Sequence, residues 1–343
     1  MDGVLNIRKA SGPTSHDVVD QVRRIFGQKR VGHAGTLDPM ASGVLVVCLG
    51  KATRVVEYLM GLPKEYRARM VLGISTDTQD STGTVISERD ASGISREAFE
   101  NAAAAFVGEI EQVPPMTSAL KHEGTRLYKL ARQGKTVDRP ARKITIYSID
   151  VTEFSSGPIP NSQFPIPDSE SPTPNSQLPT PNWAELVVRS SSGTYIRTLC
   201  SDIGDRLGCG AHMSALERTR VGQFAIEGSV TIEELESATR DGRLDSLAMT
   251  MDDALAGLPS VAIAGEDVAR ASNGMAVPCS EAHSEADTVR ILSPEGVLVG
   301  IGEVLDRSAG RIVKPRKVLI GDPTPNSQPP APDPRPPTPG AFP

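Results

Sequence analysis

The stretch RVGHAGTLDPMASGVL, residues 30–45, presents a single carboxylate, Asp38, among glycines and a proline. An aspartate before proline avoids the α region, so Asp38 is predicted to lie on extended or turn backbone. A lone carboxylate there suits a nucleophile or electrostatic stabiliser at a sugar carbon whose leaving group needs little protonation. The usual glycoside hydrolase needs a second acid, and no nearby acid offers one. The structural alternative is that Asp38 caps a short helix beginning at Pro39.

Arg197 lies where a helix is predicted to begin, in GTYIR (193–197). Ile203 and Leu207 continue one apolar face of this helix, which places the arginine in the first turn. A cation there opposes the helix dipole. Two explanations remain open. The guanidinium is exposed and solvated, at a cost of roughly 0.3 kcal/mol, or it is buried against a carboxylate that it keeps ionised.

Three planar side chains lie near basic residues in a chain with few aromatics: His33, Tyr66 and Tyr195. Bases drawn out of a nucleic-acid stack need such planar partners. The alternative for each one is a half-buried core position.

Other chemistries are disfavoured by spacing. Gly50–Thr53 resembles the end of a phosphate loop, but six residues, VLVVCL, separate Gly43 from Gly50, where the motif has four. Those six predict a buried strand, which cannot cradle a phosphate. The four cysteines form no CxxC pair, which argues against a zinc ribbon and a disulfide scaffold. No signal peptide or transmembrane run is visible, so we expect a cytoplasmic protein without a membrane partner.

The elements that must position these residues mix helices and strands. Apolar periodicity predicts helices over Thr14–Phe26 and Ser95–Val107, and a capping box at Thr231–Glu234 opens another. Strands are predicted over 44–49, 65–73, 144–154 and 183–190. From about Pro259 the chain changes to short β-like runs, which indicates a second, β-rich domain.

Proline separates the folded parts from the rest. Residues 155–182 carry eight of the 28 prolines and residues 322–343 carry ten, and both segments contain PNSQ. Such segments bury too little apolar surface to fold, so they are interpreted as a tolerated loop insertion and a tail rather than a recognition motif. We predict a catalytic domain over 1–240 with a disordered insertion at 155–182, a connector at 241–258, a β-rich domain at 259–320, and a disordered tail at 321–343.

Basic residues gather at both ends of the folded part. Residues 1–70 contain eleven Lys or Arg and six Asp or Glu, within a chain whose net charge is −6. Residues 307–320 contain five Lys or Arg and no acid. This pattern is expected of a protein whose two domains both contact a polyanion, although charge alone fits a solvated surface equally well.

Five motifs occur in an order that resembles the bacterial TruB family of tRNA pseudouridine synthases. They are GHAGTLDPMASGVL (32–45), KEYRA (64–68), SALKHEGTRLYKLARQG (118–134), GTYIRTL (193–199) and LGCGAHMSALERTRVG (207–222). The resemblance covers about residues 3–235, and 259–320 is similar to the small RNA-binding domain of PUA type. It implies an α+β fold with a mixed, mostly antiparallel central sheet flanked by helices.

The resemblance also implies residue roles. Asp38 matches the catalytic aspartate at C1′ of the target uridine, and Arg197 the arginine that pairs with it. Tyr66 matches the tyrosine that stacks on the flipped base and helps to remove the C5 proton. His33 matches the histidine that fills the space left in the RNA, and Tyr195 a tyrosine that lines the base pocket.

Three further positions are assigned to substrate binding: Lys9, Gly12 and Arg54. Lys9 and Gly12 match the N-terminal Lys-Pro-x-Gly stretch of the family, with Ala10 where proline is usual. Arg54 belongs to the basic set of residues 1–70.

The implied activity is isomerisation of the uridine at position 55 in the TΨC loop of tRNA. Reactant and product are isomers, so no cofactor or metal is expected, and a monomer acting without guide RNA is predicted. Three alternatives remain: a guide-dependent subunit of the dyskerin kind, a non-catalytic tRNA-folding chaperone, and a glycosidase of free nucleosides.

Overall fold

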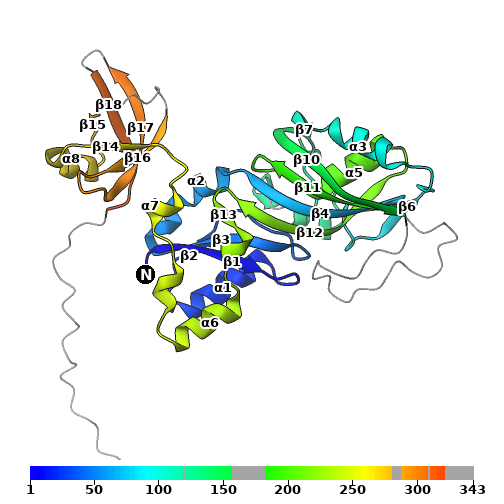
Figure 1. The fold of residues 1–343 in the computed structure, drawn as a ribbon, viewed down its shortest axis with the longest axis horizontal. Coiled ribbons are helices and arrows are strands. Elements are labelled where there is room, and N and C mark those ends of the chain that lie inside the picture. Colours follow the sequence, from blue (N-terminus) through cyan, green and yellow to red (C-terminus); the bar gives the residue numbers. More distant parts are fainter. Residues whose placement is uncertain (119, 157–181, 280–286, 308–309, 321–343) are drawn as a thin grey trace, which may run out of the picture. The chain divides into compact units, whose positions relative to one another are not determined.

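The computed structural model describes residues 1–118, 120–156, 182–279, 287–307 and 310–320. Contacts between Cα atoms divide the chain into one unit from Met1 to Gly257 and a second that begins at Leu258 (Figure 1). We predicted a connector over residues 241–258. Residues 241–257 lie in the first unit, where the backbone of Met249 pairs with that of Val4. The PNSQ segments and the C-terminal tail lie outside the described residues.

A nine-stranded sheet forms the frame of the first unit. Its main order is β1-β3-β12-β4-β11-β10-β7, with β2 beside β3 and β13 beside β12. Only the β3–β12 pairing is parallel among these described strands, which confirms the expected mixed, mostly antiparallel sheet. The strands are β1 (Gly3–Lys9), β2 (Val31–His33), β3 (Ser42–Leu49), β4 (Lys64–Leu72), β7 (Gly108–Gln112), β10 (Arg142–Ser156), β11 (Asn182–Ser190), β12 (Ala211–Val221) and β13 (Phe224–Ala225).

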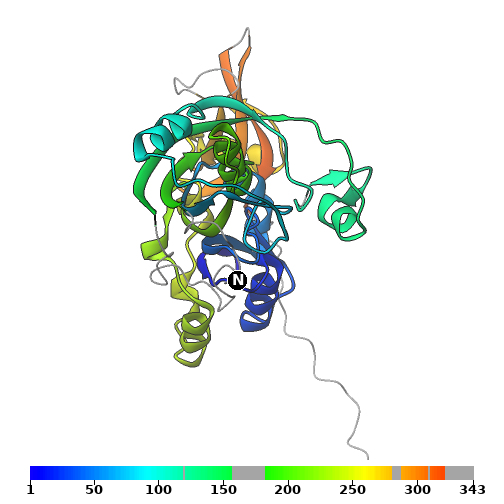
Figure 2. The ribbon, with the colours of Figure 1, turned by 90° about the vertical axis from the view of Figure 1, so that its right-hand side faces the viewer.

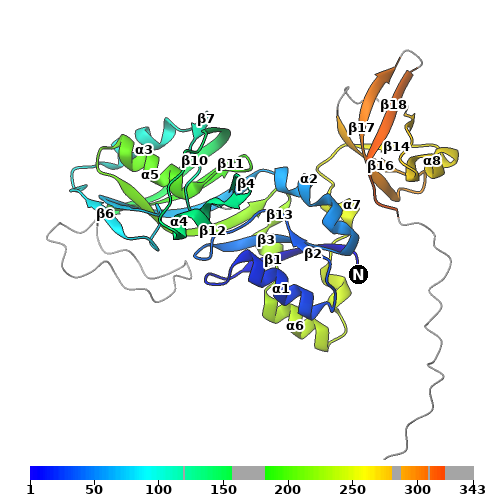
Figure 3. The same ribbon diagram turned by 180° about the vertical axis from the view of Figure 1, so that it is seen from behind.

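Two sets of helices cover different parts of this sheet. Near β1 and β3 lie α1 (Ser15–Ile25) and α6 (Ile232–Arg240), which bury Val18, Val22 and Leu235 against the strands (Figure 3). Over the other end, α3 (Arg96–Ala104) and α5 (Ile196–Arg206) enclose a core with alternate residues of β4 and β11. The predicted helices over 14–26 and 95–107 are confirmed, as is the capping box at Thr231.

Shorter elements connect the large ones. They are η1 (Gly50–Val55), α2 (Val56–Gly61), η2 (Ile226–Gly228), η3 (Leu244–Leu247), α7 (Met251–Ala254) and the hairpin of β5 (Ile74–Thr76) with β6 (Val85–Glu88). A second hairpin, β8 (Lys121–His122) with β9 (Thr125–Arg126), leads into α4 (Leu127–Arg132). Figure 2 shows this β8–α4 segment standing away from the sheet. Every helix in the described ranges is too short or too polar to span a bilayer.

The predicted pairing of residues 144–154 with 183–190 is confirmed. Strands β10 and β11 run antiparallel, with Ile149 opposite Val188 and Ser156 opposite Asn182. The fold therefore continues across the proline-rich insertion, because the two ends of the insertion leave the sheet as neighbours.

The second unit contains a five-stranded sheet ordered β14-β16-β17-β18-β15. Its elements are β14 (Ser260–Ala262), η4 (Gly265–Asp267), α8 (Val268–Ser272), β15 (Val277–Pro278), β16 (Thr288–Leu292), β17 (Leu298–Arg307) and β18 (Gly310–Val318). A small core of Val261, Val289, Ile291 and Val313 lies beneath α8. A β-rich C-terminal domain was expected, and the structure confirms it.

Candidate active site

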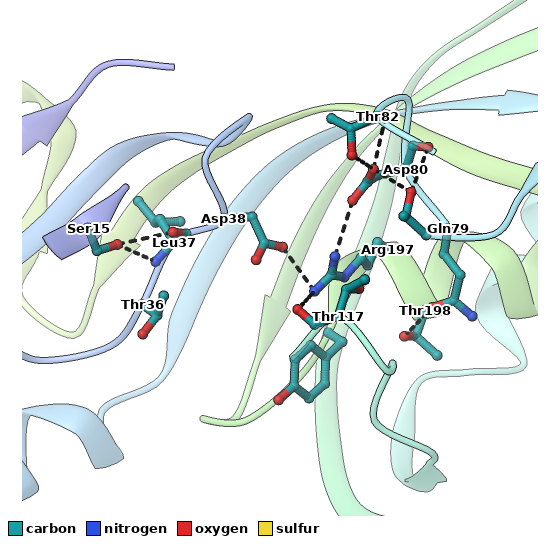
Figure 4. Close-up of polar contacts among 12 residues, drawn as sticks. Ser15, Thr36, Leu37, Asp38, Gln79, Asp80, Thr82, Thr117, Arg197 and Thr198 are labelled. Atoms are coloured by element: carbon teal, nitrogen blue, oxygen red, sulfur yellow. Dashed lines mark hydrogen bonds and ion pairs between the residues drawn. The ribbon is translucent and has the colours of Figure 1, made fainter. Parts of the chain in front are cut away.

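Asp38 and Arg197 meet although 159 positions separate them in the sequence. The Oδ2 atom of Asp38 lies 3.4 Å from Nη2 of Arg197 (Figure 4). Only 5% of the arginine side chain is exposed, whereas 32% of the aspartate side chain is. The arginine is therefore the buried partner, which decides between its two explanations, and the aspartate keeps one accessible side.

Asp80 is a third charged residue of this site, and the sequence alone did not indicate it. Its Oδ2 lies 3.2 Å from Nη1 of Arg197, and its side chain is 4% exposed. Thr78 and Thr82 donate three hydrogen bonds to Oδ1 of Asp80, from the two hydroxyls and the Thr82 amide. The guanidinium thus lies between two carboxylates, of which Asp80 is fully hydrogen-bonded and Asp38 is not (Figure 4).

The loop that carries Asp38 is fixed on both sides of the aspartate. The hydroxyl of Ser15, at the start of α1, accepts from the Leu37 amide at 2.9 Å and donates to the Leu37 carbonyl at 3.1 Å. The amide of Gly12 donates to the Pro39 carbonyl. Residues 38–41 form a turn that leads directly into β3, so Asp38 caps no helix.

Lys9 is a further support of the loop that carries Asp38. Its ammonium donates to the carbonyls of Ala10, Pro39 and Ala41, and the side chain is fully buried. Burial lowers the pKa of Lys9 to about 8. The buried Lys9 ammonium holds the Asp38 turn, a different task from the RNA contact that the sequence suggested.

Arg218 links the Asp38 loop to the strand that bears Tyr66. Its buried guanidinium donates to the carbonyls of Val44, Thr36 and Gly35, and it interacts with the Tyr66 hydroxyl. Gly43 is required here, because a Cβ atom would lie 2.2 Å from the Arg218 carbonyl oxygen. Tyr66 itself lies buried in β4, directly opposite Arg218 in the β12–β4 register.

Arg197 also contacts the backbone at Thr117. Its Nη2, the atom that faces Asp38, donates to the Thr117 carbonyl at 3.3 Å. The neighbouring Thr198 hydroxyl donates to the side-chain oxygen of Gln79, whose φ of 66° lies in the left-handed region. That strained residue turns the backbone so that Asp80, the next residue, faces Arg197.

Burial raises the pKa of Asp38 above its ordinary value. Arg197 opposes this rise, and the nearby carboxylate of Asp80 adds to it. A carboxylate with few hydrogen bonds and a shared cation is more basic and more nucleophilic than a solvated one. Asp38 is therefore suited to attack or to stabilise an electron-poor carbon.

The planar side chains lie in the same electrostatic environment. Burial raises the pKa of Tyr195. The charge of Arg197 opposes this rise, and the charge of Asp38 adds to it. Burial and the nearby Arg218 lower the pKa of His33. At neutral pH His33 is therefore an uncharged ring suited to stacking, at the end of β2.

Arg54 lies apart from this group. It is exposed in η1, which follows β3, whereas Asp38 precedes β3. The eight residues of β3, about 26 Å of extended chain, lie between the two in the sequence. Arg54 thus follows the opposite end of β3 from the Asp38 loop.

The basic count over residues 1–70 overstated the exposed positive surface. Lys9, Lys64 and Arg69 are buried. Lys64 donates to the carbonyls of Met60 and Leu62, and Arg69 forms an ion pair with Glu185 at 2.6 Å. In the second unit, Asp306 and Glu303 pair with two of the five cations, Arg311 and Arg316. Burial and pairing follow from tertiary contacts, which a charge count cannot see.

Asp80 and Arg218 are the residues that sequence reasoning missed. Asp80 stands in TDTQDST (76–82), where closely spaced hydroxyl residues around an aspartate are the signal that could have identified it. Arg218 carries no such signal, because an arginine in a strand is ordinarily a surface residue.

Solved structures that share this architecture include protein complexes and a ribonucleoprotein. One is described as the crystal structure of a Cbf5-Nop10-Gar1 complex, with a TM-score of 0.68 and 31% identity over 93% of this chain and 85% of that chain. Another is an H/ACA RNP bound to a substrate RNA containing 2'-deoxyuridine, with a TM-score of 0.67 and 29% identity over 93% and 85%.

Residues 23–196 match the N-terminal domain of the TruB family pseudouridylate synthases, and residues 197–256 match the C-terminal domain of tRNA pseudouridylate synthase B. Relatives named tRNA pseudouridine synthase B include one from Pelotomaculum thermopropionicum, 42% identical over 87% of this chain and 90% of its own. Another, from Clostridium perfringens strain 13, is 42% identical over 88% and 95%. The chain belongs to the TruB family, and it is a pseudouridine synthase.

Proposed function

We propose that this protein isomerises the uridine at position 55 in the TΨC loop of tRNA to pseudouridine, as a monomer in the cytoplasm and without a guide RNA. The observation that carries the proposal is the partly accessible Asp38 carboxylate beside the buried Arg197 guanidinium. The family supplies the reaction class, and the tRNA substrate follows from the names of relatives that match nearly the whole chain.

The chemistry requires one carboxylate and one proton acceptor. The Asp38 carboxylate attacks or stabilises C1′ while the C1′–N1 bond breaks, and uracil leaves as a resonance-stabilised anion that needs no second acid. The freed base turns and forms a C–C bond from C5 to C1′, which releases Asp38. The C5 proton then passes to an acceptor and N1 gains a proton, so atoms and charge balance without a cofactor.

Each remaining site residue takes one part of this sequence. Arg197 supports the charge of Asp38 in its buried surroundings. Tyr66 stacks on the extruded base and helps to remove the C5 proton. His33 occupies the gap in the RNA, and Tyr195 lines the base pocket. Lys9 and Gly12 position the Asp38 turn through the Pro39 carbonyl.

RNA contacts offset the cost of flipping the nucleotide, which is a few kcal/mol, about the energy of unstacking a base. Exposed cations such as Arg54 and Lys314 are available for phosphate contacts, and we assign RNA binding to the second, PUA-like unit. Binding should weaken as salt rises, because each phosphate contact releases a counterion.

The decisive experiment incubates the purified protein with a TΨC stem-loop transcript and maps pseudouridine by carbodiimide marking and sequencing. We expect a mark at position 55 without any added RNA or protein. Asp38→Asn should remove the mark, whereas Asp20→Asn, the same exchange at an exposed position of α1, should leave it unchanged.

The same assay separates the alternatives. A mark that requires added guide RNA and partner proteins would favour a dyskerin-type subunit. Accelerated tRNA folding with no mark would favour a chaperone, and release of free uracil would favour a nucleoside glycosidase. A mark at other uridines only would contradict position 55.

A further inference from the structure

Gln112 makes a two-point contact with the backbone just before Arg197. It is the last residue of β7, and it is buried, with 2% of the residue exposed. Its Oε1 accepts from the Tyr195 amide at 2.8 Å, and its Nε2 donates to the Tyr195 carbonyl at 3.0 Å. One side chain therefore satisfies both backbone groups of a residue 83 positions away.

This contact lies where α5 lacks a cap of its own. Tyr195 is the N-cap residue of α5, and no side-chain hydrogen bond caps the helix. The Tyr195 carbonyl already accepts from Leu199 in the first turn, so the Gln112 amide adds a second donor to it. Arg197, two residues on, lies in a first turn whose dipole opposes its charge.

The chain after Gln112 continues along the same helix end. The Thr117 carbonyl accepts from Arg197. Two contacts thus join residues 112–117 to the start of α5. Of these two, the Gln112 contact fixes the helix backbone and the Thr117 contact holds a side chain.

We propose that Gln112 is a positioning residue of this enzyme: its amide fixes the start of α5, and so sets where the Arg197 guanidinium meets Asp38. The proposal rests on the proposed function, because it concerns the same carboxylate. A shift of the helix start by a fraction of an ångström would lengthen the 3.4 Å ion pair directly.

An exchange of amide for acid tests this role at one atom. In Gln112→Glu one carboxylate oxygen still accepts from the Tyr195 amide, but the other faces the Tyr195 carbonyl, and two acceptors repel each other. Protonation of the glutamic acid restores the missing donor. The defect of Gln112→Glu should therefore shrink as pH falls, whereas a packing defect would not depend on pH.

Single-turnover rate constants on the TΨC stem-loop, each divided by the wild-type value at the same pH, measure the effect. We expect Gln112→Ala to fall about tenfold at every pH, since each tenfold is about 1.4 kcal/mol and a lost buried hydrogen bond costs that much. Gln112→Glu should fall about thirtyfold at pH 8 and recover to within about threefold at pH 5.5. The Kd for the RNA should stay within about twofold, as neither variant changes a phosphate contact.

Asn182→Asp is the matched control. Asn182 is equally buried, and its amide donates to the Ala91 carbonyl at 2.7 Å, at the opposite end of the β10–β11 pair from the site. It should lose thermal stability to a similar degree, with a rate unchanged below its melting temperature.

A pH-independent rate ratio for Gln112→Glu would overturn the proposal, as would an equal rate loss in Asn182→Asp. Failure of the proposed function is a separate result, since the wild-type protein would then leave no mark at position 55.

Discussion

Asp38 and Arg197 face each other from two different kinds of backbone. Asp38 lies in an irregular loop that is held by groups directed at its carbonyls, above all the ammonium of Lys9 and the hydroxyl of Ser15. Arg197 lies in the first turn of a regular helix and contacts Asp80 and the Thr117 carbonyl as well as Asp38. The arginine is thus well supplied with partners, and the aspartate is not.

The difference indicates how the carboxylate that we propose as the reacting group is kept available. Hydrogen-bond donors stabilise a carboxylate but occupy its oxygens, as Thr78 and Thr82 do at Asp80. Asp38 receives its support through the backbone, so its position is fixed while its oxygens stay available. The cation can contact several acceptors through its two Nη atoms because its proposed task is electrostatic.

The largest effect should come from the aspartate itself. Asp38→Asn removes the nucleophilic charge while its amide oxygen can still face Arg197, so the single-turnover rate should fall by at least about 10³-fold. The RNA dissociation constant should remain within about threefold, measured by filter binding. Activity within tenfold of wild type would show that the carboxylate is not the reacting group.

Removal of the cation should act through the ionisation of Asp38. Two cations lower the pKa of Asp38, and Arg197 has the larger effect. Arg197→Met should therefore raise that pKa further. The rate should fall about 10²-fold at pH 7, and the acid limb of the pH–rate profile should move to higher pH. Asp80→Asn removes a charge that raises the pKa and should move the limb to lower pH. Equal shifts in the same direction would contradict the three-residue arrangement.

The loop support should matter less than either charge. Lys9→Met removes one donor from each of three carbonyls, and we expect about a tenfold loss of rate as the Asp38 turn loosens. Lys64→Met is the matched control, because Lys64 is also buried on backbone carbonyls and its pKa is also lowered to about 8.

Both lysine variants should share one stability signature. For a lysine with a lowered folded pKa, the unfolded chain binds more protons between about pH 8 and 10.4. Unfolding free energy therefore rises with pH across that window in the wild-type protein, and the rise should be smaller in each variant. Denaturant titrations at pH 8 and pH 10 measure it. If Lys64→Met lost as much rate as Lys9→Met, the loss would reflect a general loss of stability and not the position of the Asp38 turn.

The smallest effect is a gain. The folded pKa of Asp38 is raised, so its ionised form destabilises the fold at neutral pH. Asp38→Asn should raise the melting temperature by about 1–3 °C at pH 7.5. The gain should shrink as pH falls and vanish below about pH 3, where the wild-type carboxyl is protonated in both the folded and the unfolded states. A loss of stability at pH 7.5 would show that Asp38 is better satisfied than its contacts indicate.

Local patterns predicted much of the framework. The helix over 14–26 follows from an apolar face and a threonine cap, and the β10–β11 hairpin from two apolar strands around a proline-rich insertion. These features depend on residues close in sequence, or on strands whose ends must be neighbours. The task of Lys9 was not predictable, because burial of an ammonium depends on three carbonyls that only the folded loop brings together.

By itself, the sequence determined which residues we propose for the chemistry and the kind of backbone that holds them: an aspartate before proline on a turn, and an arginine at a helix start. Only the tertiary structure decided how they act together. Asp80 and Gln112 lie 117 and 83 positions before the residues that they contact. Contacts across such separations depend on which strands become neighbours in the sheet, and no spacing within a local segment records that order.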